Sequence, residues 1–111
     1  MNLLLAQCTP QREPIPAEQL PTWLGQVPGW QPDAENKLIA RAFRFENFYQ
    51  TMAFVNAVAE LAHAQDHHPD LMVSYGACTV SFSTHSAKGL TSNDFICAAQ
   101  VSALPEAEAA Q

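Results

Sequence analysis

A long amphipathic segment runs from Glu46 to about Gln65, and it limits the possible folds more than any other feature. Phe48, Met52, Val55, Ala59 and Ala62 mark one face of a helix, which Phe54, Val58 and Leu61 widen. These intervals of three and four residues are typical of a helix with one buried side. Pro69 prevents the helix from continuing. The sequence therefore predicts one long helix over 46–65, around which the rest of the chain must pack.

Short strands are predicted on both sides of this helix. After it, 71–75 and 78–84 alternate in polarity and are separated by Gly76, as in half-buried strands. Before it, 30–45 indicates a hairpin with its turn over 33–36. A short helix over 17–26 and a last helix that begins at Thr91 complete the pattern, with Asp94 expected only to cap the latter.

This order of elements predicts an α+β fold, a four-stranded antiparallel sheet with helices packed on one face. The length of 111 residues suits a single domain over 1–111. We expect an ordered core over about 16–103, with flexible tails at 1–14 and 105–111.

The charge balance argues against several classes of partner. The formal net charge is −6 and the chain has only five Lys and Arg residues, so binding to nucleic acid or to an anionic membrane is not expected. The first eight residues, MNLLLAQC, lack the basic start and the long apolar run of an export signal. The three cysteines form no CxxC pair. Reduced thiols in the cytoplasm are the simplest interpretation.

Two adjacent histidines follow the long helix. His67 lies at its predicted end, while Pro69 directs His68 toward extended backbone, and His85 ends the 78–84 strand. If that strand runs beside the helix end, the three rings can line one pocket. The carboxylates of Asp66 and Asp70 and the helix C-terminus would favour the imidazolium form there.

A metal site is the competing hypothesis. His63 and His67 are four residues apart on the helix, and His68 or His85 could complete a three-histidine zinc site. Adjacent histidines are awkward ligands for one ion, however, and the glutamate of an HExxH motif is absent. We therefore expect no metal. Each histidine considered alone could also be an ordinary surface or turn residue.

The run His63-x-x-x-His67-His68-Pro69, followed by Tyr75, His85 and Asp94, resembles the signature of the pterin-4a-carbinolamine dehydratase family. The similarity extends to Gly29-Trp30 and to the segments 41–48, 53–62 and 84–99, and it covers about residues 16–103. The last segment is similar to bacterial members in particular. The resemblance implies the same four-stranded α+β fold, assembled into homodimers or homotetramers.

The resemblance also implies an activity, that of a 4a-hydroxytetrahydrobiopterin dehydratase. This hydro-lyase removes water from a 4a-hydroxytetrahydropterin to give the quinonoid dihydropterin, and so recycles the pterin of aromatic amino acid hydroxylases. No cofactor is implied, because the pterin is the substrate. Imidazoles with a pKa of about 6.5 can both give and accept protons at neutral pH.

The site residues follow from the matching positions. His67, His68 and His85 are implied as catalytic: His67 as base at the ring nitrogen, His85 as donor to the leaving hydroxyl, and His68 as orienting group, with exchange of these roles open. The implied substrate-binding residues are Asp66, His67, His68, Ser83, Thr84, His85 and Ser86. We expect Asp66 to hold one histidine in a single tautomer.

The sequence departs from the family at two positions, His63 and Ser86, where relatives often carry an acid. Two other roles stay open. Some relatives act as dimerisation cofactors or regulators, so the chain could be a protein-binding module, and a role in molybdenum-cofactor pterin metabolism is a further alternative.

Overall fold

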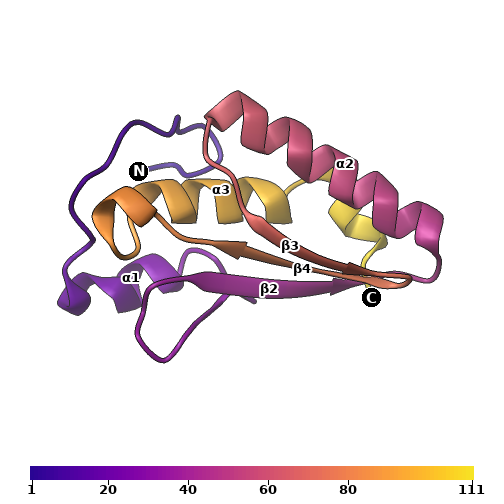
Figure 1. Cartoon of the computed structure of the whole chain (residues 1–111), viewed down its shortest axis with the longest axis horizontal. Coiled ribbons are helices and arrows are strands. Elements are labelled where there is room, and N and C mark those ends of the chain that lie inside the picture. The colour runs from indigo at the N-terminus through magenta and orange to yellow at the C-terminus, as the bar shows by residue number, and fades with distance from the viewer.

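The computed structural model describes all 111 residues and confirms the predicted α+β fold. Its four-stranded antiparallel sheet has the order β1-β2-β4-β3. The strands are β1 (Gln31–Pro32), β2 (Ile39–Arg44), β3 (Asp70–Ser74) and β4 (Ala77–Phe82). The α-helices are α1 (Leu20–Leu24), α2 (Phe48–Gln65) and α3 (Ser92–Ser102), and short 3-10 helices span Ala17–Gln19, His85–Ala87 and Pro105–Ala109. Figure 1 shows α2 and α3 on the same face of the sheet.

The two inner strands supply the core face of the sheet. On β4, Cys78, Val80 and Phe82 are completely buried and alternate with partly exposed neighbours, as the sequence predicts. On β2, Ile39 and Phe43 are buried on one parity. Arg41 has the same parity, and its guanidinium lies 4.6 Å from the centre of the Phe43 ring. The cation is accommodated there because the guanidinium lies over the aromatic ring and donates to the Ser102 hydroxyl at 3.0 Å.

The buried stripe of α2 is shifted from the predicted one. Its buried residues are Thr51, Phe54, Val58, Ala62 and Gln65. Phe48, expected on the buried face, is 48% exposed. Thr51 and Gln65 are polar, so the hydrophobic pattern of the sequence does not reveal that they belong to the buried stripe. Hydrogen bonds satisfy both side chains. The Thr51 hydroxyl, for example, donates to the Tyr75 carbonyl at 2.8 Å.

Strand β3 lies at an edge of the sheet and is the most exposed strand. The side chains of Met72 and Val73 are 76% and 41% exposed, and Tyr75 beyond the strand is 67% exposed. The half-buried pattern predicted for 71–75 holds only at Leu71, which packs against the core, and is wrong for Val73 and Tyr75 at this edge of the sheet.

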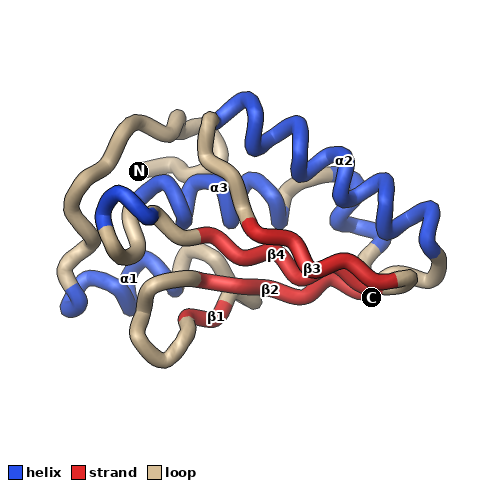
Figure 2. The backbone as a smooth tube through the Cα atoms, viewed as in Figure 1, coloured by secondary structure: helices blue, strands red, loops and turns tan.

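The two chain ends pack on the domain instead of forming solvated tails. Leu3 is 5% exposed and belongs to the core. The amides of Gln65, Asn93 and Gln100 bond backbone groups of the first nine residues, which form no regular helix or strand. Figure 2 shows this segment beside α3 and the end of α2. At the other terminus, the Gln111 N–H donates to the Arg44 carbonyl at 2.7 Å.

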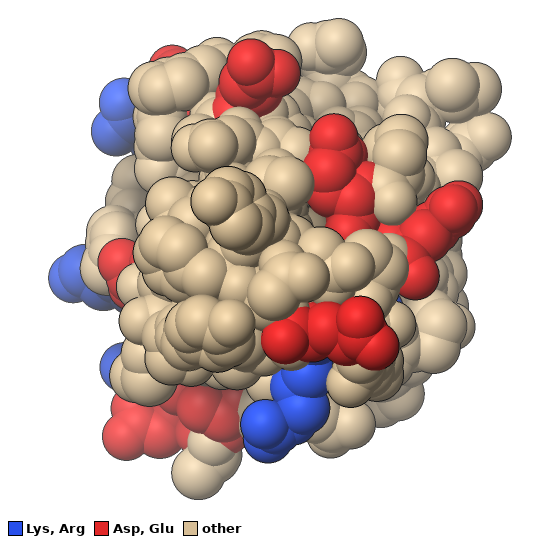
Figure 3. All heavy atoms as spheres, turned by 90° about the vertical axis from the view of Figure 1, so that its right-hand side faces the viewer, with Lys and Arg blue, Asp and Glu red and all other residues tan.

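The surface shows the charge balance of the sequence. On the face drawn in Figure 3, acidic side chains are scattered among neutral ones and basic side chains are few. No helix is both long enough and apolar enough to cross a bilayer.

Candidate active site

The end of α2 sets the position of His67. Asp66 takes a left-handed conformation, with φ 50° and ψ 41°, which aspartate tolerates better than most residues. The chain turns there, and the His67 N–H closes the helix on the Ala62 carbonyl at 3.2 Å. The imidazole consequently folds back onto the sheet and stacks on Phe82, with ring centres 5.9 Å apart and planes at 12°.

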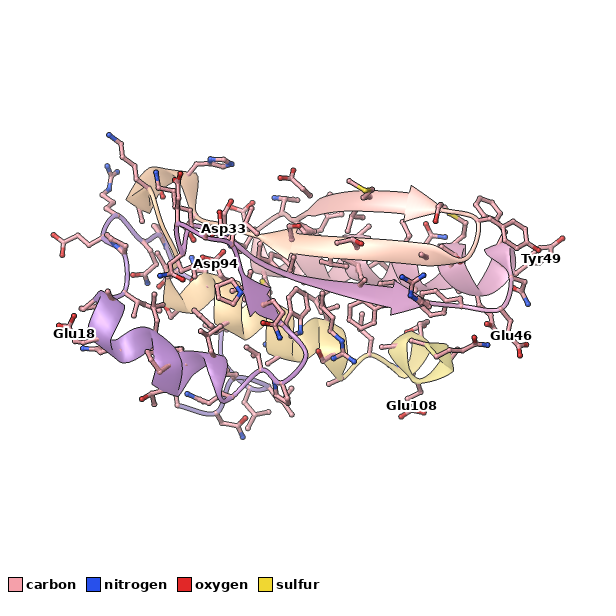
Figure 4. All side chains as sticks on the ribbon, turned by 90° about the horizontal axis from the view of Figure 1, so that it is seen from below. Glu18, Asp33, Glu46, Tyr49, Asp94 and Glu108 are labelled. Carbon is pink, nitrogen blue, oxygen red and sulfur yellow. The ribbon has the colours of Figure 1, made fainter.

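His67 is paired with a buried carboxylate. Its Nε2 lies 2.7 Å from Oδ1 of Asp94, whose side chain is completely buried while that of His67 is 12% exposed. Figure 4 shows Asp94 inside the fold near the start of α3. We expected Asp66 to hold a histidine in one tautomer, but the partner is Asp94. Asp66 is exposed and affects His67 only through its negative charge, which raises the pKa of the imidazole.

The Asp94 carboxylate has two further donors. Its Oδ2 accepts from the Thr91 N–H at 2.9 Å, which completes the predicted capping box, and from the Thr84 hydroxyl at 2.8 Å. The Thr84 and Thr91 hydroxyl oxygens are 2.8 Å apart. Because the one proton of Thr84 is given to the carboxylate, Thr91 donates to Thr84. The network therefore presents an oriented acceptor to His67.

This environment raises the pKa of His67. Burial alone lowers the pKa, because it disfavours the charged ring, but the hydrogen bond and negative charge of Asp94 outweigh that effect. Cys8 and Asp66 add smaller contributions in the same direction. With its Nε2–H donated to Asp94, the neutral ring keeps Nδ1 free as a base.

His67 opens onto a cavity of about 260 Å³. Its walls come from the N-terminal segment, the end of α2, the chain after β4 and the start of α3. The lining residues are Cys8, Thr9, Pro10, Gln11, Gln65, Asp66, His67, Thr84, Ser86 and Asn93. A larger cavity of about 520 Å³ lies beside Leu3 and Arg41, but it is lined by no histidine, carboxylate or thiol. We therefore place the candidate site at the smaller cavity.

The predicted convergence of three imidazoles in one pocket is not found within the chain. His85 is exposed and lines a separate cavity of about 350 Å³ with Ser83 and Lys88, and Thr84 lines both cavities. Thr84 has extended backbone and turns inward to Asp94. Successive side chains of an extended segment point to opposite sides, which directs His85 away from His67.

His68 lies apart from both cavities. Its exposed ring is 5.5 Å from that of His63 in an edge-to-face arrangement. No group of three or more His, Cys, Asp or Glu side chains is arranged to hold a metal ion. Of the other predicted binding residues, Ser86 lines the His67 cavity and donates its hydroxyl to the Gln11 carbonyl at 2.7 Å.

Sequence reasoning missed the N-terminal wall of the site and the second role of Asp94. Cys8, Thr9 and Gln11 lie in a segment without periodicity, so no pattern predicts their position. The bond from Asp94 to His67 joins residues 27 positions apart. The capping box accounts for one of the three bonds to Asp94, and the place of Asp94 in the family signature was the only other signal of a role beyond it.

Comparisons with known proteins agree with this architecture. A family model described as "Pterin 4 alpha carbinolamine dehydratase" matches residues 13–104. A Xylella fastidiosa protein is 47% identical over 96% of this chain and 94% of its own, and a Stenotrophomonas maltophilia protein is 50% identical over 94% and 92%. Both are provisionally named pterin-4-alpha-carbinolamine dehydratases.

Solved structures share the fold. A Brucella melitensis protein described as a transcriptional coactivator/pterin dehydratase has a TM-score of 0.78 at 28% identity, over 82% of this chain and 97% of that one. A pterin dehydratase-like RuBisCO assembly factor of the alpha-carboxysome has a TM-score of 0.61 at 22% identity, over 70% and 90%. By the family match and the close sequence relatives, the chain belongs to the pterin-4a-carbinolamine dehydratase family.

Proposed function

We propose that the protein is a hydro-lyase that removes water from a 4a-hydroxytetrahydropterin and gives the quinonoid dihydropterin, which recycles the pterin of an aromatic amino acid hydroxylase. Membership of the family supports the reaction class. The observation that carries the proposal is the His67–Asp94 pair, with its 2.7 Å contact and its position on a cavity.

The pair fits the proton transfers of the reaction. Loss of the 4a-hydroxyl requires a proton for the departing oxygen and removal of a proton from a ring nitrogen. In the proposal His67 accepts the nitrogen proton at Nδ1, while Asp94 holds the ring and stabilises the imidazolium through Nε2. A positioned acid or base of this kind contributes on the order of 10² to 10⁴ in rate. Side chains alone supply these groups, so the proposed reaction needs no cofactor.

The substrate in this proposal spans Thr84, the residue common to both cavities. His85 would then protonate the leaving hydroxyl from the far side. Asp66 and Ser86 would contact the pterin in the His67 cavity, and Ser83 would contact it beside His85. The orienting role of His68 stays a prediction.

Turnover of an authentic substrate tests the proposal. The purified protein is mixed with 4a-hydroxytetrahydropterin generated by a hydroxylase, and the dehydration is followed by ultraviolet absorbance. His67→Ala and His85→Ala should each lower kcat strongly, whereas His63→Ala, an exposed histidine outside both cavities, should not. Dehydration no faster than in buffer would defeat the proposal.

A protein-binding regulatory role is the second candidate. The structurally similar Brucella melitensis protein is described as a coactivator as well as a pterin dehydratase. The net charge of −6 disfavours direct contact with DNA but permits a protein partner. Negligible turnover together with a stable, stoichiometric protein complex would favour this candidate over the enzyme.

We also propose that the protein works as a homodimer or homotetramer in the cytoplasm. The exposed apolar edge at Met72 and Val73 is a surface that folded proteins usually cover. Val73→Lys should therefore reduce the mass measured by light scattering, and an unchanged mass would argue against assembly through this edge. All three cysteines are free thiols, which suits a reducing compartment.

A further inference from the structure

Two sulfur atoms meet at the wall of the candidate site. Sγ of Cys8, on the N-terminal segment, lies 3.6 Å from Sγ of Cys97 on α3. The Cys8 sulfur is also 3.7 Å from the Asn93 carbonyl. The two cysteines are 89 positions apart in the sequence. The third cysteine, Cys78, is buried in β4 and offers an internal control.

The two thiols differ in access. Cys8 is partly exposed and lines the His67 cavity, which gives a small solute a route to this residue. Cys97 is completely buried and does not line the cavity. A reagent that enters from solvent meets Cys8 first, and Cys97 is in reach of Cys8 itself.

The surroundings also shift the pKa values of the two thiols in opposite directions. A hydrogen bond from the Cys97 thiol lowers the pKa of Cys8 and outweighs the opposing effect of burial. The positive charge of His67 lowers this pKa further, and the negative charge of Asp94 acts against it. The same contact, together with burial, raises the pKa of Cys97. Cys8 is thus the more readily formed thiolate, which is the nucleophilic form of cysteine, and Cys97 remains a thiol.

We propose that Cys8 is a peroxide-reactive cysteine and that Cys97 is its resolving partner. The Cys8 thiolate attacks one oxygen of a hydroperoxide, and an S–O bond forms as the O–O bond breaks. The other oxygen leaves as hydroxide or alkoxide and takes up a proton. Cys8 is oxidised to a sulfenic acid while the peroxide is reduced.

The second step consumes the Cys97 thiol. Its sulfur attacks the Cys8 sulfenic sulfur, the S–O bond breaks, and the departing hydroxide takes the Cys97 proton to leave as water. A disulfide length of about 2.05 Å requires the sulfurs to approach by roughly 1.5 Å. Cys8 can supply this movement because its segment has no regular secondary structure, although its N–H is held by Gln65 at 2.7 Å.

Peptide mapping of the peroxide-treated, full-length protein tests the proposal. Hydrogen peroxide should produce a Cys8–Cys97 linked peptide and an intact mass lower by two hydrogens, both reversed by dithiothreitol. Cys78→Ser should behave like the wild type, because burial raises the pKa of Cys78 to about 11 and it has no thiol partner.

Two variants separate the steps. Cys97→Ser should accumulate the sulfenic acid at Cys8, captured as a dimedone adduct, and Cys8→Ala should leave Cys97 unoxidised at the same peroxide dose. Should Cys97→Ser fail to fold, the wild-type peptide map still decides. Oxidation of Cys97 in Cys8→Ala, or a wild-type protein that forms no linked peptide while free cysteine in the same solution is oxidised, would overturn the proposal.

Discussion

Asp94→Asn tests the assignment of Asp94 as the group that orients His67. The substitution keeps the shape of the side chain but removes its charge and one acceptor oxygen. The amide carbonyl can replace Oδ2, which accepts from Thr84 and Thr91, and the amide NH₂ then faces Nε2 of His67. Nε2 must become an acceptor, so the ring proton moves to Nδ1. The nitrogen that should act as base is thereby blocked.

The magnitudes follow from the three hydrogen bonds to the carboxylate. Bonds to a charged group contribute about 1.5–3 kcal/mol and neutral bonds about 0.5–1.5 kcal/mol, so each bond weakens by roughly 1 kcal/mol and the free energy of unfolding should fall by about 3 kcal/mol. The pKa of His67 should fall because the substitution removes the two contributions that raise it most. We expect kcat to fall on the order of 10² to 10⁴.

Three measurements check this prediction. Long-range nitrogen–proton NMR correlations report the His67 tautomer, denaturant titration gives stability, and the dehydration assay gives kcat. Asp70→Asn, the same substitution at an exposed carboxylate nearby, is the control and should change stability by less than about 0.5 kcal/mol. If Asp94→Asn left the proton on Nε2 and kcat unchanged, the orienting role of Asp94 would be refuted.

Three further predictions concern stability. Because the folded protein raises the pKa of His67, it holds that proton more tightly than the unfolded chain; the resulting stabilisation is complete below about pH 6.5 and is lost as pH rises through the folded pKa. Denaturant titrations across this range should show the free energy of unfolding falling as pH rises. The same dependence on pH in His67→Gln would contradict the prediction. Leu3→Ala should cost about 2–5 kcal/mol, whereas Leu5→Ala, at a side chain that is 80% exposed, should cost less than about 0.5 kcal/mol; equal effects would mean that the N-terminal segment does not pack as described. Thr51→Val leaves the Tyr75 carbonyl without its donor and should cost about 1–3 kcal/mol in thermal or denaturant unfolding, while Thr51→Ser keeps the bond and should cost less.

The sheet could be predicted because the pattern that specifies it lies within single strands. Cys78, Val80 and Phe82 alternate with polar neighbours on one strand, and that pattern alone decides which side faces the core. The same holds for the end of α2 before Pro69. Thr51 and Gln65 escaped prediction because a buried polar side chain depends on a partner elsewhere in the chain, which no local pattern specifies.

The candidate site could be predicted only in part, for the same reason. Resemblance identified Asp66, His67, Thr84 and Ser86, which line the cavity. It did not identify Cys8 or the bond between His67 and Asp94, since both depend on contacts between distant segments. The expectation that His85 shares the pocket depended on the 78–84 strand running beside the end of the long helix. The strand does bring Thr84 to Asp94, but Thr84 turns inward there, and the exposed His85 lines a separate cavity.

The cavity wall built from the first residues has a consequence for biosynthesis. Thr9 is translated well before Asn93, which is 84 positions later in the chain, yet the Thr9 carbonyl accepts a hydrogen bond from the Asn93 side chain. Closing so long a loop is entropically costly until the late helix has docked. The N-terminal wall of the cavity therefore cannot close until α3 has been translated and has docked on the sheet.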